Sequence, residues 1–596
     1  MTRCERLRRD DGGWAMVVVL GTMMTLSLLV ALALTSASRA LGTSRQEQDS
    51  VAALSAAQAG VQHFLDQLNR NSTYYLTPAP DPANPALRAN AADPAVRLSV
   101  ATQAVTTGPE PSFRYQVLST QAQVASTGRV VLKSVGRSRR VERTVQVSFT
   151  NDSIFKYLYY TEFETAPPSV AGSSPVECTR LSHGHHGETA PRLPAPQPGG
   201  GGCPEVSFRG DASSLTDRVY GMVHTEDRIT INGSPQFYGP VETGWNDPAG
   251  VGWVKASAAT TATPQFFAGT PTHVDFPFPK YNRDLRQEAV DRGCLYTGPT
   301  RIIYLSTGRM SVTLSPGGTA SGTGCGAFTP TVRTQEVAVR SNGVVWVDKL
   351  PVTAPACAIA DQRAALGFPV PEDNALVGVS PSLGHDCRSA SVYVEGWVAG
   401  QTTLGSEDNV FVTGNLRYAA GLGKPVGATV DPNPAITGDE VSVDTAGSDV
   451  LGLYANTGYV AVYHPGKCEP NERDAVNAMC TAYKGSEIAL PAAPPQRPTS
   501  YPMTEVQVDA AIITPQAFLV PNHNLGVPQS GTRVLHLVGS VAQRFRGPVS
   551  DRDASSNVRG FVKEYRYDPR LKSVPPPFLA DVTATAWGVS QFAETG

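Results

Sequence analysis

The stretch that decides the fold is Trp14–Ser38, WAMVVVLGTMMTLSLLVALALTSAS, which runs for 25 residues without a charge. At about 1.5 Å per residue, a helix over this stretch would reach about 37 Å, enough to cross a hydrocarbon core of about 30 Å. The sequence from Arg39 to about Asn71 has an amphipathic pattern that can continue the same helix. We therefore predict one long helix over residues 14–71, whose first half spans a membrane.

The charges on either side of the apolar stretch indicate its orientation. Four arginines precede it, whereas Arg39 is the nearest cation after it; the four are Arg3, Arg6, Arg8 and Arg9. Because positive flanks stay on the cytoplasmic side, residues 1–13 are expected in the cytoplasm and the bulk of the chain outside the cell. The sequence thus predicts a single-pass protein of the cell membrane.

A secretory signal peptide is the alternative interpretation of this N-terminus. Thr35–Ala40 offers small residues to a peptidase. The apolar stretch is, however, longer than the usual signal-peptide core of about 7–15 residues, and it leads without a break into a patterned helix. We therefore favour a helix that is retained in the mature protein.

The second half of the predicted helix carries one apolar stripe. Its members are spaced by three or four residues, which places them on one face; they are Val51, Leu54, Ala57, Val61, Leu65 and Leu68. A coiled-coil or bundle helix would show the same stripe. The more specific interpretation is a helix that lies half in the membrane and half against its own domain.

Gly13, the apolar stretch after it and the segment Ala56–Gly60, AAQAG, together resemble the N-terminus of type IV prepilin-like proteins. The likeness is greatest to the PilX-type minor pilins and the large minor pseudopilins of type II secretion. This resemblance implies that a prepilin peptidase removes the leader 1–13 after Gly13, with Gly12 as the alternative site. Trp14 would then be the methylated mature N-terminus. It also implies other pilin or pseudopilin subunits as partners.

One position departs from that family. Most pilins have glutamate at the fifth mature position, where this chain has Val18. In major pilins this carboxylate pairs with the N-terminus of a neighbouring subunit. The resemblance to pilins, together with the absence of this carboxylate, implies a minor component that is placed at or near a filament tip.

Composition describes the rest of the chain. More than 500 residues follow the helix, enough for two or more domains. Only 17% of residues are charged, while Gly (55) and Pro (48) are abundant, which is typical of short strands joined by many turns. The net charge of −3 provides no basic surface, so nucleic acid is not expected as a partner.

Cysteine usage agrees with the predicted topology. Cys4 lies in the leader, and the other eight lie beyond the apolar stretch without any Cys-x-x-Cys spacing, so we expect disulfides and no metal site. Eight cysteines allow 105 connectivities. We favour sequence neighbours: Cys178 with Cys203, Cys294 with Cys325, Cys357 with Cys387, and Cys468 with Cys480.

Strand patterns predict an α+β and mainly β fold. Runs at 113–120, 128–135 and 140–149 alternate apolar and polar residues, with Gly136 in a turn, and predict an antiparallel headpiece over 95–150. Residues 151–218 are interpreted as a linker and disulfide-bracketed loop, and 219–596 as a β-rich module. Similar units at 221–233 and 396–414 favour a β-solenoid, with a β-sandwich as the alternative.

The C-terminal part carries a second resemblance. Gly452–Asn456, Gly539–Gly547 and Tyr565–Leu571 are similar to segments near the ends of large pilin-like surface proteins of high-GC Gram-positive bacteria. Those proteins have no assigned catalytic residues that could be carried over.

Several polar residues suggest chemistry but have simpler explanations. Asp227, Asp408 and Asp509 could be the carboxylates of a solenoid glycosidase, yet aspartate is also a common corner residue. The histidines at 183, 185 and 186 lie in a Gly/Pro-rich segment typical of a solvated loop. We therefore expect a non-enzymatic subunit without a cofactor, acting in filament assembly, tip display or surface adhesion. The alternatives are a surface-anchored carbohydrate-active enzyme and a membrane-anchored adhesin unrelated to pili.

Overall fold

The computed structural model describes most of the chain, with gaps between short segments. The described residues are 12–70, 74–88, 96–97, 111–120, 123–124, 129–151, 154–171, 178–179, 203–210, 216–245, 251–257, 261–276, 278, 285–340, 343–351, 365–366, 388–421, 447–463, 505–521, 534–552, 558–572, 574–579 and 587–595.

The chain forms two compact units, which are described separately. The first, here called the anchor unit, comprises residues 1–124, 128–150 and 587–596. The second, here called the large unit, comprises residues 125–127 and 151–586. The large unit is therefore an insertion, and the boundary that we expected between a headpiece and a module extending to residue 596 needs correction. The last ten residues belong to the anchor unit.

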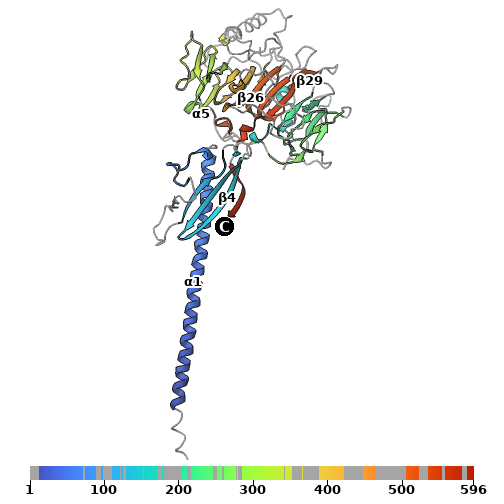
Figure 1. Ribbon diagram of the computed structural model, residues 1–596. Helices are drawn as coiled ribbons and strands as arrows, with labels where there is room; N and C mark the ends of the chain where they lie inside the picture. Colours follow the sequence, from blue (N-terminus) through green and yellow to red (C-terminus); the bar gives the residue numbers. More distant parts are fainter. Residues whose placement is uncertain are drawn as a thin grey trace, which may run out of the picture. The chain divides into compact units, whose positions relative to one another are not determined.

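The anchor unit begins with helix α1 (Gly12–Arg70), a single helix of 59 residues (Figure 1). Its apolar half contains hydroxyl side chains that bond to the carbonyls of the preceding turn. Thr22 Oγ1 donates to Val19 O at 2.9 Å, and Ser27 Oγ donates to Met23 O at 2.7 Å. These polar groups are therefore satisfied within the helix, as an apolar environment requires.

A five-stranded sheet completes the anchor unit, in the order β1-β2-β3-β4-β32. Its strands are β1 (Val96–Arg97), β2 (Ser112–Val117), β3 (Arg129–Ser138), β4 (Val141–Asn151) and β32 (Trp587–Thr595), and the short helix η1 (Tyr74–Leu76) follows α1. Strands β1 to β4 pair antiparallel. The turn between β3 and β4 lies at Arg139, with φ 50°, and not at Gly136, which is inside β3.

The large unit consists mainly of short strands. In its first part these are β5 (Tyr159–Phe163), β6 (Phe208–Gly210), β7 (Arg218–Tyr220), β8 (Val223–Thr225), β9 (Ile229–Gly233), β10 (Gln236–Phe237), β11 (Val241–Thr243), β12 (Trp253–Lys255), β13 (Gln265–Phe266) and β14 (Thr272–His273). The middle part has β15 (Cys294–Thr297), β16 (Thr300–Leu305), β17 (Arg309–Leu314), β18 (Ala320–Ser321), β19 (Thr334–Ala338) and β20 (Gly343–Asp348).

The last part of the large unit contains the longest strands. They are β21 (Val392–Val398), β22 (Gln401–Ser406), β23 (Val410–Tyr418), β24 (Val450–Ala455), β25 (Val460–Val462), β26 (Glu505–Thr514), β27 (Phe518–Leu519), β28 (Val534–Phe545), β29 (Ser550–Arg552), β30 (Val558–Gly560) and β31 (Val562–Tyr567). The helical elements of the unit are η2 (Ile154–Lys156), α3 (Pro168–Ala171), α5 (Leu285–Arg292), η4 (Ala419–Gly421) and η6 (Pro569–Lys572).

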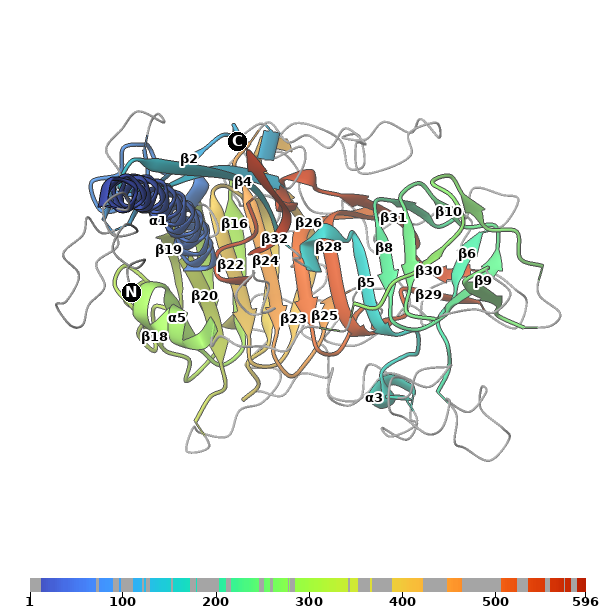
Figure 2. The same cartoon turned by 90° about the horizontal axis from the view of Figure 1, so that it is seen from below.

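Most strands of the large unit join in parallel ladders. One ladder runs β20-β22-β24-β26-β28-β5-β8-β11-β14, and these strands lie side by side in Figure 2 from β20 to β8. A second runs β28-β31-β7-β10-β13, and a third joins β6, β9 and β12. Antiparallel pairs occur at β15–β18, at β16–β17–β19 and at β29–β30.

The core of the large unit lies between these ladders and combines residues from distant parts of the chain. Val219, Phe237, Leu537 and Tyr565, from four different strands, are all buried in it. Strand β5, within the segment that we interpreted as a linker, pairs with both β28 and β8 and contributes Tyr159 to the same core. The described residues within 151–218 are therefore an integral part of the large unit, because their aromatic side chains fill its interior.

Candidate functional site

The apolar half of α1 is bare of protein contacts. Its large apolar side chains from Trp14 to Leu34 are exposed, and the helix is long and apolar enough to cross a membrane. Such a continuous apolar surface on one exposed helix needs apolar surroundings. The structure therefore has one N-terminal helix consistent with single-pass anchoring.

The two predicted processing residues lie in the first turn of this helix, which begins at Gly12. Trp14 is 76% exposed, and Val18 is 55% exposed one turn further on. A side chain at position 18 therefore faces the surroundings of the helix and not the body of the anchor unit.

The second half of α1 packs on the sheet through the predicted apolar stripe, with the exception of its first residue. Ala57, Val61 and Leu68 are buried, and Leu54 and Leu65 pack against the same core. Val51, by contrast, is 66% exposed. Its place in the predicted stripe was wrong, because the helix rests on the sheet through small residues.

Those small residues are Ala53, Ala56, Ala57 and Gly60. A Cβ atom on Gly136 of β3 would lie 2.0 Å from the carbonyl oxygen of Ala53, so the helix backbone touches the strand backbone there. Ser134 Oγ also donates to the carbonyl of Ala57 at 2.8 Å. The spacing of these small residues is the sequence signal that indicates a close helix–sheet contact. A stripe chosen mainly by its large apolar residues does not include Ala53, Ala56 or Gly60.

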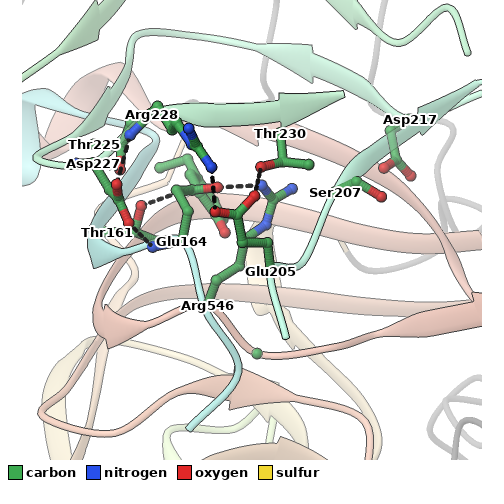
Figure 3. A network of polar contacts seen from close by, with 12 residues as sticks. Thr161, Glu164, Glu205, Ser207, Asp217, Thr225, Asp227, Arg228, Thr230 and Arg546 are labelled. Atoms are coloured by element: carbon green, nitrogen blue, oxygen red, sulfur yellow. Dashed lines mark hydrogen bonds and ion pairs between the residues drawn. The ribbon is translucent and has the colours of Figure 1, made fainter. Parts of the chain in front are cut away.

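In the large unit, a buried ion pair joins the residues that directly follow β5 and β28 (Figure 3). Arg546 Nη1 donates to Glu164 Oε2, and the Thr161 hydroxyl donates to the other oxygen of the same carboxylate. The guanidinium of Arg546 also lies 3.7 Å from the ring centroid of Phe208. Burial raises the pKa of the Glu164 carboxyl, which the nearby Arg546 offsets only in part.

The network extends to the loop before β9. Asp227 accepts hydrogen bonds from the backbone N–H of Glu164 at 3.2 Å and of Arg228 at 2.9 Å. Arg228 and Thr230 both donate to Glu205, at 3.1 and 2.7 Å (Figure 3). These hydrogen bonds and ion pairs link the segment around Glu164, the segment around Glu205 and the segment from Asp227 to Thr230.

A row of polar side chains crosses β26 and the second parallel ladder. The strand register aligns Gln507, His536, Glu564, Arg218, Gln236 and Gln265 in successive strands. Glu564 lies 3.5 Å from His536 Nδ1 and 3.7 Å from Arg218 Nη1, and it also pairs with Arg566. Burial opposes ionisation of Glu564, but His536 and Arg566 outweigh it and lower the pKa to about 2.

The three aspartates considered as catalytic candidates each have their own partners. Asp408 accepts from the N–H of Ala390 at 2.9 Å and pairs with Lys349 at 3.0 Å. Asp509 accepts from the N–H of Tyr418 at 2.9 Å, and burial raises its pKa to about 6. Together with Asp227, these carboxylates serve backbone N–H groups at turns and strand ends.

Two of the predicted cysteine pairs are disulfides in the structure, Cys178–Cys203 and Cys294–Cys325. Cys357, Cys387, Cys468 and Cys480 lie outside the described residues, as does the histidine cluster at 183–186. Within the described part of the chain, no group of His, Cys, Asp or Glu side chains is arranged to hold a metal ion.

Comparisons with known proteins do not identify a family for this chain. No family model matches the chain, and no curated protein matches it. Among solved structures, the crystal structure of the competence-associated pilin ComZ from Thermus thermophilus aligns with 92% of this chain and 97% of its own, at 12% identity and a TM-score of 0.29. At that TM-score, the likeness supports no conclusion about this chain.

Proposed function

We propose that this chain is a membrane-anchored minor subunit of a type IV pilus or a related secretion filament, similar to PilX-type minor pilins and large pseudopilins. The observation that carries the proposal is helix α1, which is bare and apolar in its first half and packed on an antiparallel sheet in its second. One rigid helix can thereby join a membrane or a filament core to a folded body.

The leader supports the same proposal. Residues 1–13 carry the cations and would remain in the cytoplasm until a prepilin peptidase cuts after Gly13. The mature chain would then begin at Trp14, and both units would lie outside the cell. The disulfides of the large unit suit that oxidising location.

The large unit would be the part that the filament displays. Its parallel ladders, with β5, β8, β11 and β14 in register one after another, support a β-solenoid. Its carboxylates at turns serve backbone groups, which supports a display or adhesion role without catalysis. The kinship with large pilin-like surface proteins of high-GC Gram-positive bacteria belongs to the same proposal.

Val18 supports a place at the filament tip. A buried carboxylate without a partner is expensive in an apolar environment, so a subunit with nothing ahead of it loses nothing by having valine there. The size of the large unit also suits a tip, because a body of more than 400 residues is hard to pack along a shaft.

Mass spectrometry of the mature protein tests the processing step. We expect an N-terminus at Trp14 and loss of Cys4 with the leader. A mature chain that begins at Met1, or after residue 37, would contradict the pilin assignment.

Quantitative proteomics of purified filaments tests the tip placement. We expect few copies of this chain per filament, and stoichiometry equal to that of the main shaft subunit would refute it. A Val18→Glu variant that assembled no differently from the unaltered chain would show that this position carries no information about placement.

A further inference from the structure

The anchor unit contains a cavity of about 300 Å³ beside α1. Its walls come from three parts of the unit: His63 and Gln67 of α1, Phe113 of β2, and the segment after η1. From that segment the lining residues are Asp81, Ala83, Asn84, Pro85 and Ala86, together with Tyr74 of η1. The lining thus combines one carboxylate, several neutral polar groups and aromatic rings.

A chain of hydrogen bonds fixes one wall of this cavity. Tyr74 OH donates to Asp81 Oδ2 at 3.2 Å, and Asn84 Nδ2 donates to Tyr74 OH at 2.8 Å. Asn84 Nδ2 also donates to Tyr115 OH at 2.5 Å, and Tyr115 OH lies 2.9 Å from His63 Nδ1. Tyr115 OH therefore accepts from Asn84 and forms a second hydrogen bond with His63 Nδ1, whose direction is set by the tautomer of the ring.

The bond to Tyr115 determines which nitrogen of His63 is left for a ligand. With Nδ1 engaged by Tyr115, Nε2 is the ring nitrogen that remains. Burial lowers the pKa of His63, and Arg70 adds to the lowering, while Asp66 opposes it. The ring is therefore neutral at physiological pH, and its Nε2 donates or accepts according to the tautomer.

Bonds to the backbone hold the same two side chains, Asp81 and Asn84, in place. Asp81 Oδ1 accepts from the N–H of Ala83 at 2.9 Å, and Asn84 Oδ1 accepts from the N–H of Ala86 at 3.1 Å. These bonds close two tight turns, so the polar groups are positioned before any ligand arrives. A preformed wall lowers the ordering cost of binding.

We propose that this cavity binds a neutral polyhydroxylated ligand the size of one sugar unit. The volume lies at the lower end of the range of small-molecule sites, about 300–1,000 Å³. Hydroxyl groups both donate and accept, which suits His63 Nε2, the Gln67 amide and the Asp81 carboxylate. The rings of His63 and Phe113, whose centroids lie 5.8 Å apart, supply an apolar wall for C–H groups.

Charge argues against an anionic ligand. Asp81 is the only charged side chain that lines the cavity within the described residues, and it would repel a carboxylate or a phosphate. The site lies wholly within the anchor unit, so the inference does not depend on filament assembly.

Saturation-transfer NMR on the full chain in detergent micelles tests this inference. The probes are the methyl glycosides of glucose, galactose and N-acetylglucosamine, with glucuronic acid as the anionic comparison. We expect transfer to at least one neutral glycoside and weaker transfer to the acid. Gln67→Ala should weaken binding about fivefold through loss of a polar contact, whereas Gln62→Ala, on the exposed face of the same helix, should leave it unchanged.

A variant that fills the cavity provides a second test of ligand binding. Ala83 is exposed at the cavity wall, so Ala83→Trp should fill the space and abolish transfer while circular dichroism stays unchanged. The inference is overturned if none of the three glycosides receives transfer, or if glucuronic acid binds better than all of them. It is also overturned if Gln67→Ala behaves as Gln62→Ala does, a comparison that holds even if Ala83→Trp does not fold.

Discussion

Charged side chains in the large unit form buried ion pairs between segments that are far apart in sequence. Arg546, just after β28, pairs with Glu164, just after β5. Lys563 Nζ lies 2.8 Å from Asp217 Oδ2. A buried ion pair adds little net stability over apolar residues, but removal of one partner leaves the other charge uncompensated and is costly. These pairs therefore favour one register of the ladders over its alternatives, and they make single substitutions informative.

Glu564 gives a pH-dependent prediction. Its pKa of about 2 in the folded protein lies below the ordinary 4.5, so it stabilises the fold above pH 4.5, and that contribution is lost as the pH falls toward 2. The difference corresponds to about 3 kcal/mol. We expect Glu564→Gln to lower the free energy of unfolding by up to that amount at pH 7, and by less at pH 3.

Urea unfolding of the full chain at both pH values, followed by tryptophan fluorescence, measures this difference. Glu505→Gln is the matched control, because Glu505 is exposed in strand β26, which is separated from β31 by β28. Equal losses for Glu564→Gln at pH 7 and pH 3 would show that the effect is not linked to ionisation.

At the scale of elements, helix α1 is stabilised by how closely it approaches β3. The alanine and glycine face from Ala53 to Gly60 allows backbone contact at Gly136, and Phe64 then fills the space above β2 and β4 with Tyr115 and Phe149. An isolated helix of this length in water would depend on its sequence propensities alone. Here the second half is ordered by packing, and the first half has an apolar surface that a membrane can cover.

Gly136→Ala tests this close approach. The new Cβ would lie 2.0 Å from Ala53 O and 2.3 Å from Ala57 N, so the helix must shift away from the strand. We expect the anchor unit to lose about 3 kcal/mol of stability, as for an overpacked core. Hydrogen exchange of the amides at 53–60 should rise.

Gly21→Ala is the matched control for that substitution. Nothing lies within 4 Å of a Cβ at position 21, and alanine favours a helix over glycine. A Gly136→Ala protein with exchange rates like those of Gly21→Ala would mean that α1 does not rest on β3 in solution.

The Cys294–Cys325 disulfide is a second element-scale test. It closes a span of 31 residues at the start of β15, and Tyr296 OH donates to the carbonyl of Cys325 at 3.1 Å. In the chain-entropy model, the Cys294→Ser/Cys325→Ser variant should destabilise the large unit by about 3 to 4 kcal/mol. Thermal unfolding measures this loss. Cys4→Ser should have no effect, and an unchanged transition in the double variant would contradict the structural role.

At the scale of the whole molecule, the large unit is an insertion in the chain between two strands of the anchor unit. The chain leaves after β4, builds the large unit and returns as β32, which lies next to β4. Trp587 at the start of β32 is buried with Tyr75, and its backbone N–H donates to Asn69 Oδ1 at 2.7 Å. The anchor unit can therefore be completed only after β32 is available.

Trp587→Ala tests this dependence. Trp587 is 3% exposed, so its loss should cost the anchor unit about 3–5 kcal/mol and leave the large unit with its own core unchanged. Calorimetry should show one transition shifted to lower temperature and the other unmoved. Val589→Ala, at a position that is 44% exposed on the same strand, is the control. A shift of both transitions would show that the two units do not unfold independently.

Local patterns were sufficient for part of this architecture. The uncharged stretch at 14–38 and the periodic residues after it predicted α1, because helical periodicity is set by neighbouring residues. Alternating residues predicted β2, β3 and β4 nearly to their bounds, and two cysteine pairs close together in sequence were predicted correctly. The β-rich composition indicated the character of the large unit but not its strand order.

Tertiary structure decided what depended on distant residues. The face that α1 presents to the sheet follows from the close contact at Gly136, which puts Val51 outside and Ala53 inside. The place of β32, the pairing of β5 with β28, and the cavity around His63 each join segments that lie tens to hundreds of residues apart. Such contacts form because complementary surfaces bury one another, and a pattern read along one segment does not contain the shape of its distant partner.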